Sequence, residues 1–179
     1  IWKMADMIVK VKEPLPSEFK FFKPDLIIFT FLHLAGVPQL ARALCRSHVT
    51  AIGYETVEMP DGRLPILVPM SEVAGRVATL IGARLLHMGT AGAKGLLLGG
   101  VSGTKRGIIT VVGGGVVGVN AAEVGIGLGA EITILDIKEE RLKRLQDRFK
   151  GRAQVMISSP ENISAWVKRS DLIIGAVLV

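Results

Sequence analysis

The feature that most constrains the fold is the glycine-rich segment GGGVVG at 113–118. The β-branched run IITVV precedes it, VVGVNAAEVGIGL continues from it with helical character, and Asp136 ends the next apolar run, EITILD. Three of its glycines fit the pattern G-x-G-x-x-G, namely Gly113, Gly115 and Gly118. A strand, a tight glycine turn, a helix and a second strand closed by an acidic residue are typical of a Rossmann-like, doubly wound parallel sheet.

The chain on both sides of this motif continues the alternation of strands and helices. β-Branched runs predict strands and amphipathic spacing predicts helices, in the order β-α-β-α-β-α-β. The expected strands are 108–112, 131–136, 153–158 and 171–177, and the expected helices are 116–128, 138–149 and 161–169. We therefore expect one half of a doubly wound sheet and slightly more.

A long helix is expected at 71–87, before the first of these strands. Ser71 suits the N-cap position and Glu72 suits the first turn. Apolar side chains repeat along this helix at helical spacing and are expected to form its buried stripe. They are Val73, Val77, Leu80, Ile81 and Leu85.

The first third of the chain predicts part of a second α/β domain. The expected strands are 7–11, 25–31 and 51–57. A helix at 38–48 lies between the last two and is expected to bury Cys45 as a small side chain. Strands with such connections favour parallel pairing. Two prolines flank an Asp-Gly turn at 60–65, so we expect domains at 1–65 and 66–179.

Composition excludes several classes of protein. The net charge is +6, but the basic residues are scattered, and the segment 138–152 mixes both signs as a solvated helix does, so no nucleic acid is expected. The charge-free stretches 26–40 and 108–122 are shorter than the roughly 20 residues that a membrane-spanning helix needs, so no association with a membrane is expected. A single cysteine excludes a disulfide framework and a cysteine-based zinc site, and no metal is expected. These features favour a soluble, cytoplasmic protein.

The glycine motif predicts a dinucleotide site. Gly113 permits the tight turn, Gly115 lets a pyrophosphate approach the backbone, and Gly118 lets the helix pack against the strand. N–H groups at the helix start then face the phosphate charge. Asp136 would accept hydrogen bonds from the adenosine ribose and repel a 2′-phosphate, which favours NAD over NADP, although basic residues follow it. A glycine-rich packing site without a ligand is the alternative.

Polar residues at the ends of the first three expected strands predict a second site. Lys12 lies at the carboxyl end of the first strand, His33 at that of the second, and Tyr54 and Glu55 near that of the third. In an open parallel sheet, ligands bind beyond these ends, so an ammonium, an imidazole and a carboxylate are expected at one crevice. The alternatives are a core histidine and a lysine paired with Glu13 or Glu55.

Six segments in their order resemble the alanine dehydrogenase family: KVKEP, FTFLHLA, AIGYETV, PMSEVAGR, the glycine motif and DLIIGAVLV. The resemblance covers essentially the whole chain, and the segments KVKEP, FLHLA and MSEVAG are far more specific than the glycine motif. It implies oxidative deamination of L-alanine to pyruvate and ammonia with NAD, and the reverse amination. It also implies a cytoplasmic homo-oligomer, which in the family is a hexamer, acting in amino-acid metabolism.

The resemblance further implies roles for individual residues. Lys12 resembles the lysine that binds the substrate's carboxylate or carbonyl oxygen, and His33 resembles the catalytic acid/base. Ser71 resembles a cofactor ligand at a helix start, and Arg141 stands where the family has a basic residue near the adenosine. The other implied cofactor contacts are Val116, Val117, Asp136, Ser158, Val177 and Leu178, beside the motif glycines.

The family also has a substrate-binding arginine near its N-terminus and a catalytic aspartate beyond the fourth Rossmann strand, and this chain contains neither region. We therefore expect the chain to be the central portion of a longer protein. Two alternatives stay open: the NAD-binding domain of a related proton-translocating transhydrogenase, and a non-catalytic NAD-binding module. Lys12 and His33 argue against both.

Overall fold

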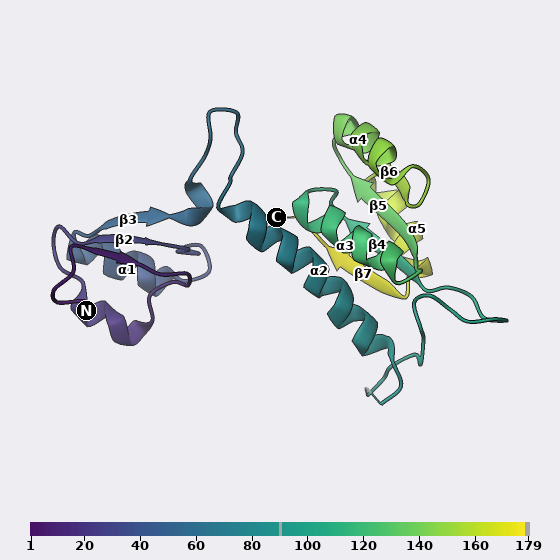
Figure 1. Cartoon of the computed structure of the whole chain (residues 1–179), viewed down its shortest axis with the longest axis horizontal. Coiled ribbons are helices and arrows are strands. Elements are labelled where there is room, and N and C mark those ends of the chain that lie inside the picture. Colours follow the sequence, from purple (N-terminus) through teal and green to yellow (C-terminus); the bar gives the residue numbers. More distant parts are fainter. Residues whose placement is uncertain (90, 178–179) are drawn as a thin grey trace. The chain divides into compact units, whose positions relative to one another are not determined.

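The computed structural model describes residues 1–89 and 91–177 and divides into two compact units, Ile1–Pro69 and Met70–Val179 (Figure 1). Helix α2 (Leu67–Leu86) begins just before this division. In each unit parallel strands alternate with helices, so the predicted α/β class is confirmed.

The first unit contains a three-stranded parallel sheet in the order β1-β2-β3. Its strands are β1 (Met7–Val9), β2 (Ile27–Thr30) and β3 (Thr50–Gly53), its helix is α1 (Pro38–Ser47), and short 3-10 helices are η1 (Pro16–Phe21) and η2 (Tyr54–Thr56). Leu40 and Leu44, one turn apart on α1, pack with Ile8 and Ile28 of the sheet. The sheet thus buries one face under the helix (Figure 1).

The second unit contains a four-stranded parallel sheet in the order β6-β5-β4-β7. Its strands are β4 (Ile108–Val112), β5 (Glu131–Asp136), β6 (Gln154–Ile157) and β7 (Leu172–Gly175). Its further helices are α3 (Val116–Gly127), α4 (Glu139–Phe149) and α5 (Pro160–Arg169). Because β5 and β6 extend from one side of β4 and β7 lies on the other, the strand order reverses at β4, where ligands bind in such sheets.

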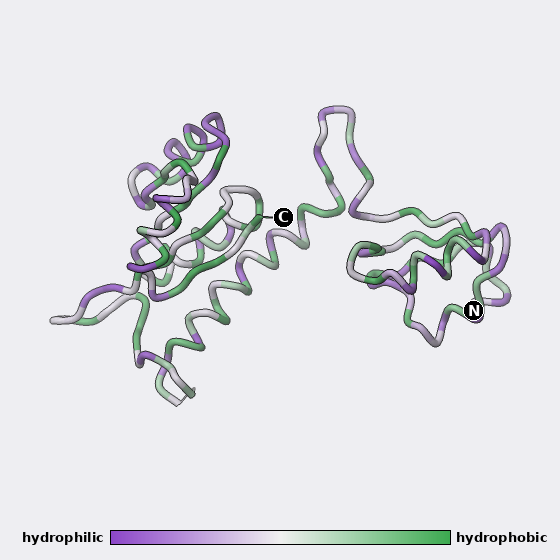
Figure 2. Tube along the Cα trace, turned by 180° about the vertical axis from the view of Figure 1, so that it is seen from behind, coloured by the Kyte–Doolittle hydropathy of each residue, from purple (hydrophilic) through white to green (hydrophobic). Residues whose placement is uncertain are grey.

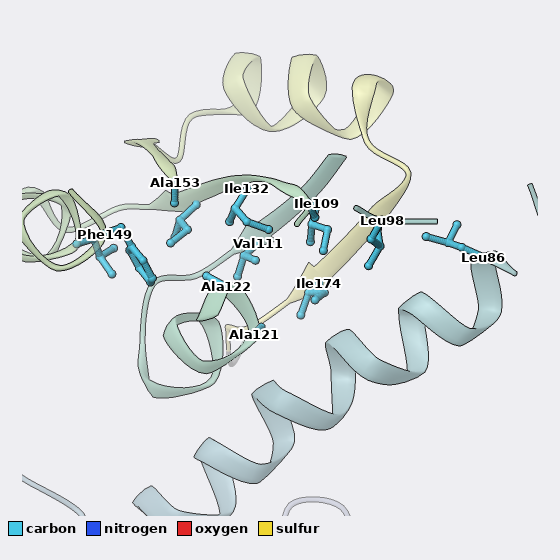
Figure 3. Packing of buried hydrophobic residues seen from close by; sticks show 13 residues of the cluster. Leu86, Leu98, Ile109, Val111, Ala121, Ala122, Ile132, Phe149, Ala153 and Ile174 are labelled. Atoms are coloured by element: carbon cyan, nitrogen blue, oxygen red, sulfur yellow. The ribbon is translucent and has the colours of Figure 1, made fainter. Parts of the chain in front are cut away.

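Aliphatic side chains of β4, β5 and β7 form the core of this unit (Figure 3). Ile109, Val111 and Ile134 are fully buried. Figure 3 shows helix α5 on one side of these strands and α3 with α2 on the other, so both faces of the sheet are covered. Coverage of both faces explains why the β4 sequence, IITVV, is almost continuously apolar rather than alternating. Each such side chain contributes roughly 1.5–3 kcal/mol to folding.

Most expected elements are present, but several boundaries were wrong. The first strand ends at Val9 instead of residue 11, and the third ends at Gly53, after which Tyr54–Thr56 forms a 3-10 turn. Cys45, expected to be buried, is exposed on α1.

The hydropathy colouring of Figure 2 shows hydrophobic segments in the strands and hydrophilic ones along α4. Among the described residues no helix combines the length and the apolar character that crossing a bilayer would require.

The expected start and buried face of α2 were both wrong. The helix begins at Leu67, so Ser71 lies in its second turn and caps nothing, and Glu72 is outside the first turn. The stripe predicted to be buried is exposed, and the buried positions are Gly75, Thr79, Gly82 and Leu86. A Cβ at Gly75 would overlap the carbonyl oxygen of Val117 on α3. Close approach of two helices selects small residues, which a hydrophobicity pattern does not identify.

Candidate functional site

A cavity of about 280 Å³ lies at the carboxyl ends of the strands in the second unit. Its walls come from the glycine turn after β4 and from the residues that follow β5, β6 and β7. The lining residues are Gly113, Gly115, Leu135, Asp136, Ile137, Lys138, Arg141, Ser158, Ala176 and Val177. This edge of the sheet, where the strand order reverses, is the expected place for a bound dinucleotide.

The three motif glycines are required for different reasons. Gly113 has a φ of +105°, and a Cβ there would lie 2.5 Å from the carbonyl oxygen of Ala176. A Cβ at Gly118 would overlap the carbonyl oxygen of Gly113, so this glycine lets α3 pack against the turn. A Cβ at Gly115, in contrast, would meet no protein atom within 4 Å, although the residue lines the cavity. Folding therefore does not demand glycine at this position, whereas a ligand close to the backbone would.

The start of α3 suits an anion. Gly115 is the N-cap of this helix and has no side chain that could bind the first backbone N–H groups. Those groups and the positive end of the helix dipole are available to a phosphate. With the open position at Gly115, they make the cavity a good fit for the pyrophosphate of a dinucleotide.

Asp136 is almost fully buried, at 3% exposure, and binds three groups. Its Oδ2 accepts hydrogen bonds from the Gly114 N–H at 2.7 Å and from Arg141 Nη1 at 2.9 Å, and its Oδ1 accepts one from the Lys138 N–H at 2.9 Å. Burial alone would raise the pKa of this carboxyl, but the Lys138, Arg141 and Gly114 bonds together with the Arg141 charge lower it below 3.8. The ionised carboxylate thus ties β5 to the glycine turn and to the start of α4.

The structure brings together some of the predicted cofactor residues but not others. Those that line the cavity are Gly113, Gly115, Asp136, Arg141, Ser158 and Val177. Val116 and Val117 begin α3 next to it, Gly118 is buried beneath the turn, and Ser71 on α2 is outside the lining. Leu178 lies outside the described residues. Sequence reasoning did not include Leu135, Ile137, Lys138 and Ala176 among the site residues, although three of them flank Asp136 at the strand end.

In the first unit, the three parallel strands end at one edge of the sheet, as the register pairs Val9 with Phe29 and Thr30 with Gly53. Lys12 follows β1 with an exposed side chain, and its carbonyl oxygen accepts a hydrogen bond of 2.9 Å from Oγ1 of buried Thr30. Ion pairs between described residues do not include Lys12. The pairing of Lys12 with an acidic neighbour, left open by the sequence, is therefore not observed.

His33 follows β2 and is exposed rather than a core residue. Its φ of +47° is unusual for a residue with a Cβ. The ring stacks on Phe31, with centroids 5.8 Å apart and planes 12° apart, and the Phe31 ring meets Tyr54 edge-on at 5.1 Å. Its backbone N–H donates to Glu55 Oε1 at 2.8 Å. An exposed imidazole on an ordered aromatic support is suited to proton transfer with a bound substrate.

Lys10, the other lysine near β1, has a structural partner. Its Nζ lies 2.6 Å from Glu18 Oε2 and 5.9 Å from the centroid of the Trp2 ring. Glu18 also accepts a hydrogen bond from the Leu15 N–H at the start of η1. Lys10 therefore stabilises the segment after β1, which leaves Lys12 as the lysine available at the strand end. Within the described part of the chain, no group of three or more metal-binding side chains occurs.

Comparison with protein families gives a match along nearly the whole chain. Residues 1–74 match the model described as "Alanine dehydrogenase/PNT, N-terminal domain", and residues 78–179 match "Alanine dehydrogenase/PNT, C-terminal domain". The two matched segments meet close to the division between the two units, Pro69 and Met70.

Curated proteins and solved structures agree with this match. The chain is 55% identical over 175 residues to alanine dehydrogenase of Staphylococcus epidermidis, covering 98% of the chain and 47% of that protein. It is 52% identical over 179 residues to that of Staphylococcus saprophyticus, covering 100% of the chain and 48% of that protein. A solved L-alanine dehydrogenase superposes with a TM-score of 0.88 at 47% identity, covering 99% of the chain and 49% of that structure. The chain thus spans about half the length of these relatives.

A transhydrogenase from Sinorhizobium meliloti has a TM-score of 0.76 at 18% identity, covering 99% of the chain and 51% of that structure. At this identity the likeness concerns the fold.

Proposed function

The chain belongs to the alanine dehydrogenase/PNT family, and from this premise we propose that it acts in an NAD-dependent alanine dehydrogenase. The reaction converts L-alanine, NAD⁺ and water to pyruvate, ammonium, NADH and a proton, and runs in reverse as reductive amination. The observation that carries this proposal is the 55% identity to a relative named alanine dehydrogenase, which extends over 98% of the chain.

Lys12 and His33 are proposed to act on the substrate. In the aminating direction, the Lys12 ammonium binds pyruvate and stabilises the negative charge that develops on the carbonyl oxygen when ammonia attacks. His33 gives a proton to the hydroxyl group of the resulting carbinolamine, which leaves as water and yields the imine. In the deaminating direction, His33 takes a proton from the water molecule that attacks the imine. The exposure of both side chains and the ordered support of His33 favour these roles.

The cavity of the second unit is proposed to bind the cofactor. The N–H groups at the start of α3 and the open backbone at Gly115 would hold the pyrophosphate, and Asp136 with Arg141 would border the adenosine ribose. When bound, NAD supplies the hydride acceptor for alanine oxidation. The buried negative charge of Asp136 favours NAD over NADP, while its ion pair with Arg141 weakens that preference.

Further properties are proposed from the family relation alone. They are a cytoplasmic location, small-molecule substrates (L-alanine, pyruvate and ammonia) and assembly into a homo-oligomer, a hexamer in particular.

The test uses this sequence completed to the length of its relatives. We expect formation of NADH that depends on both alanine and NAD. His33→Ala should lower kcat by roughly 10²–10⁴-fold without weakening NAD binding, because the imidazole acts on the substrate. His87→Ala, at an exposed histidine on the second unit, is the matched control and should leave kcat unchanged. Absence of alanine-dependent NADH formation by the completed parent enzyme contradicts the proposed activity.

A further inference from the structure

We propose that Glu55 is a positioning residue that holds His33 in the conformation needed for proton transfer, an inference that rests on the proposed function. Glu55 belongs to η2, directly after β3, whereas His33 follows β2 and lies 22 positions earlier in the chain. The register that pairs Thr30 with Gly53 brings the ends of these two strands together. The Glu55 side chain can therefore reach back across the sheet edge to the segment that carries His33.

The Glu55 carboxylate binds the backbone on the N-terminal side of His33. Its Oε1 accepts hydrogen bonds from the His33 N–H at 2.8 Å and from the Leu32 N–H at 3.0 Å, and its Oε2 lies 3.2 Å from the Leu32 nitrogen. Hydrogen bonds to an ionised acceptor are stronger than those between neutral groups. One side chain thus fixes the two successive peptide groups that precede the His33 Cα.

This anchoring coincides with an unfavourable backbone conformation. His33 has a φ of +47°, which a residue with a Cβ avoids unless its surroundings impose it. The direction of its imidazole depends on that φ. If the Leu32 and His33 N–H groups lose their acceptor, the backbone can relax to a negative φ, and the ring leaves its stacking position on Phe31.

Two neighbouring features support a fixed position for the carboxylate. Gly53 leaves the space in which the Glu55 side chain folds back, because a Cβ there would lie 3.2 Å from the carboxylate carbon. Tyr54, next to Glu55, packs edge-on against both Phe29 and Phe31, at 4.4 and 5.1 Å. The turn that carries Glu55 is therefore attached to the same aromatic cluster that supports the imidazole.

The electrostatics favour an acceptor role over a proton-transfer role for Glu55. Burial raises the pKa of this carboxyl, but backbone N–H bonds from Glu55 itself, His33 and Leu32 and the charge of His33 lower it below 4.5 overall. The side chain is therefore ionised at neutral pH and has no proton to donate. It acts on the reaction through the placement of His33.

The geometry is tested first without any enzyme assay. In the 179-residue chain, hydrogen exchange measured by NMR should show slow exchange of the Leu32 and His33 amides. Glu55→Ala should make both amides exchange fast, and Glu55→Gln, which keeps a carbonyl acceptor at the same reach, should preserve their protection. Glu58→Ala removes an exposed carboxylate three positions further along and is the control. Unchanged amide protection in Glu55→Ala overturns the proposed contact, whether or not the proposed function is correct.

The role in catalysis is tested in the chain completed to the length of its relatives. Glu55→Ala should lower kcat for alanine oxidation roughly 10- to 100-fold, as expected for a displaced catalytic group, while KM for NAD stays unchanged. Glu55→Gln should restore most of the turnover. Lost amide protection with full kcat in Glu55→Ala overturns the positioning role. Absence of activity in the parent enzyme instead refutes the proposed function. The hydrogen-exchange result on the contact between Glu55 and the His33 backbone stays valid in that case.

A third variant covers the case in which Glu55→Ala does not fold. Glu55→Asp keeps the charge but shortens the reach by one methylene group, whereas Glu55→Gln keeps the reach and loses the charge. The proposal requires Glu55→Gln to be more active than Glu55→Asp. The opposite order would mean that the charge, and not the contact with the His33 backbone, matters for turnover.

Discussion

Replacing Asp136 by Asn should destabilise the second unit far more than the change of one atom suggests. The carboxylate accepts from Gly114 and Arg141 on one oxygen and from Lys138 on the other. An amide has a single acceptor oxygen, so in either orientation its NH₂ group faces at least one backbone N–H. In the orientation of lower cost, the amide oxygen accepts from the buried Gly114 N–H. The amide NH₂ group then faces the Lys138 N–H, which loses its acceptor.

The magnitude follows from these contacts. A donor left without an acceptor in a buried site costs about 1–3 kcal/mol, and the lower end of that range applies to the Lys138 N–H because its bond is only partly buried. Loss of the ion pair with Arg141, whose side chain is 38% exposed, adds at most about 1 kcal/mol because solvent screens it. We therefore expect the free energy of unfolding to fall by roughly 1–2 kcal/mol.

Asp171→Asn is the matched control. Asp171 also accepts a backbone N–H, that of Ile108 at 3.0 Å, and pairs with Lys94 through its other oxygen. An amide there keeps the Ile108 bond, and its NH₂ group faces only an exposed lysine that can turn away. The expected loss is about 0–1 kcal/mol, with unchanged NAD binding since Asp171 is not in the cavity lining.

The assay is urea unfolding followed by tryptophan fluorescence in a Trp2→Phe background. Trp166 on α5 then reports the second unit alone, since the sequence has two tryptophans. Titration with NAD in the same background should show weaker binding for Asp136→Asn, because the Gly114 N–H of the glycine turn then binds a neutral amide instead of a carboxylate. An unfolding midpoint for Asp136→Asn no lower than that for Asp171→Asn would refute this account of the carboxylate.

Three further outcomes are expected. Gly115→Ala should leave the free energy of unfolding within about 1 kcal/mol of the parent but weaken NAD binding. Gly118→Ala should impair folding itself, because a Cβ there would overlap the Gly113 carbonyl oxygen. Urea unfolding and NAD titration of both variants test these two outcomes. The completed enzyme should prefer NAD to NADP, and Asp136→Ala should narrow that preference; equal kcat/KM for both cofactors in the parent would contradict it. Because the pKa of Asp136 is below its ordinary 3.8, its ionised form stabilises the second unit above that pH, and this contribution is lost as pH falls through the folded-state pKa. Acid unfolding monitored by Trp166 should accordingly depend less steeply on pH in Asp136→Asn than in the parent.

Local sequence signals were sufficient for strands β4 and β5 and for the glycine turn between β4 and α3. β-Branched runs such as IITVV and EITILD form β4 and β5, and the spacing of Gly113, Gly115 and Gly118 matches a turn between β4 and α3. Placement of Lys12, His33 and Glu55 at or near the ends of three neighbouring strands also followed from the sequence, because parallel strands end at one edge of a sheet. Each of these inferences depends on a short segment and on general rules of strand order.

Other features depended on which segments pack together. The exposed stripe of α2 looked like its buried face, yet Gly75, Thr79 and Gly82 are buried because α3 and β7 approach too closely for larger side chains. Hydrophobic periodicity measures the apolar character of a face, and not the distance to its neighbour.

The sequence by itself determined the α/β class, the glycine turn and the chemical groups at the two candidate sites, since these are set by residue type and spacing. Only the tertiary structure decided their partners. Asp136 binds Gly114, 22 positions away, and Glu55 binds His33, also 22 positions away. A hydrogen bond requires two groups within about 3 Å of each other, and for residues so far apart in sequence the fold alone sets that distance.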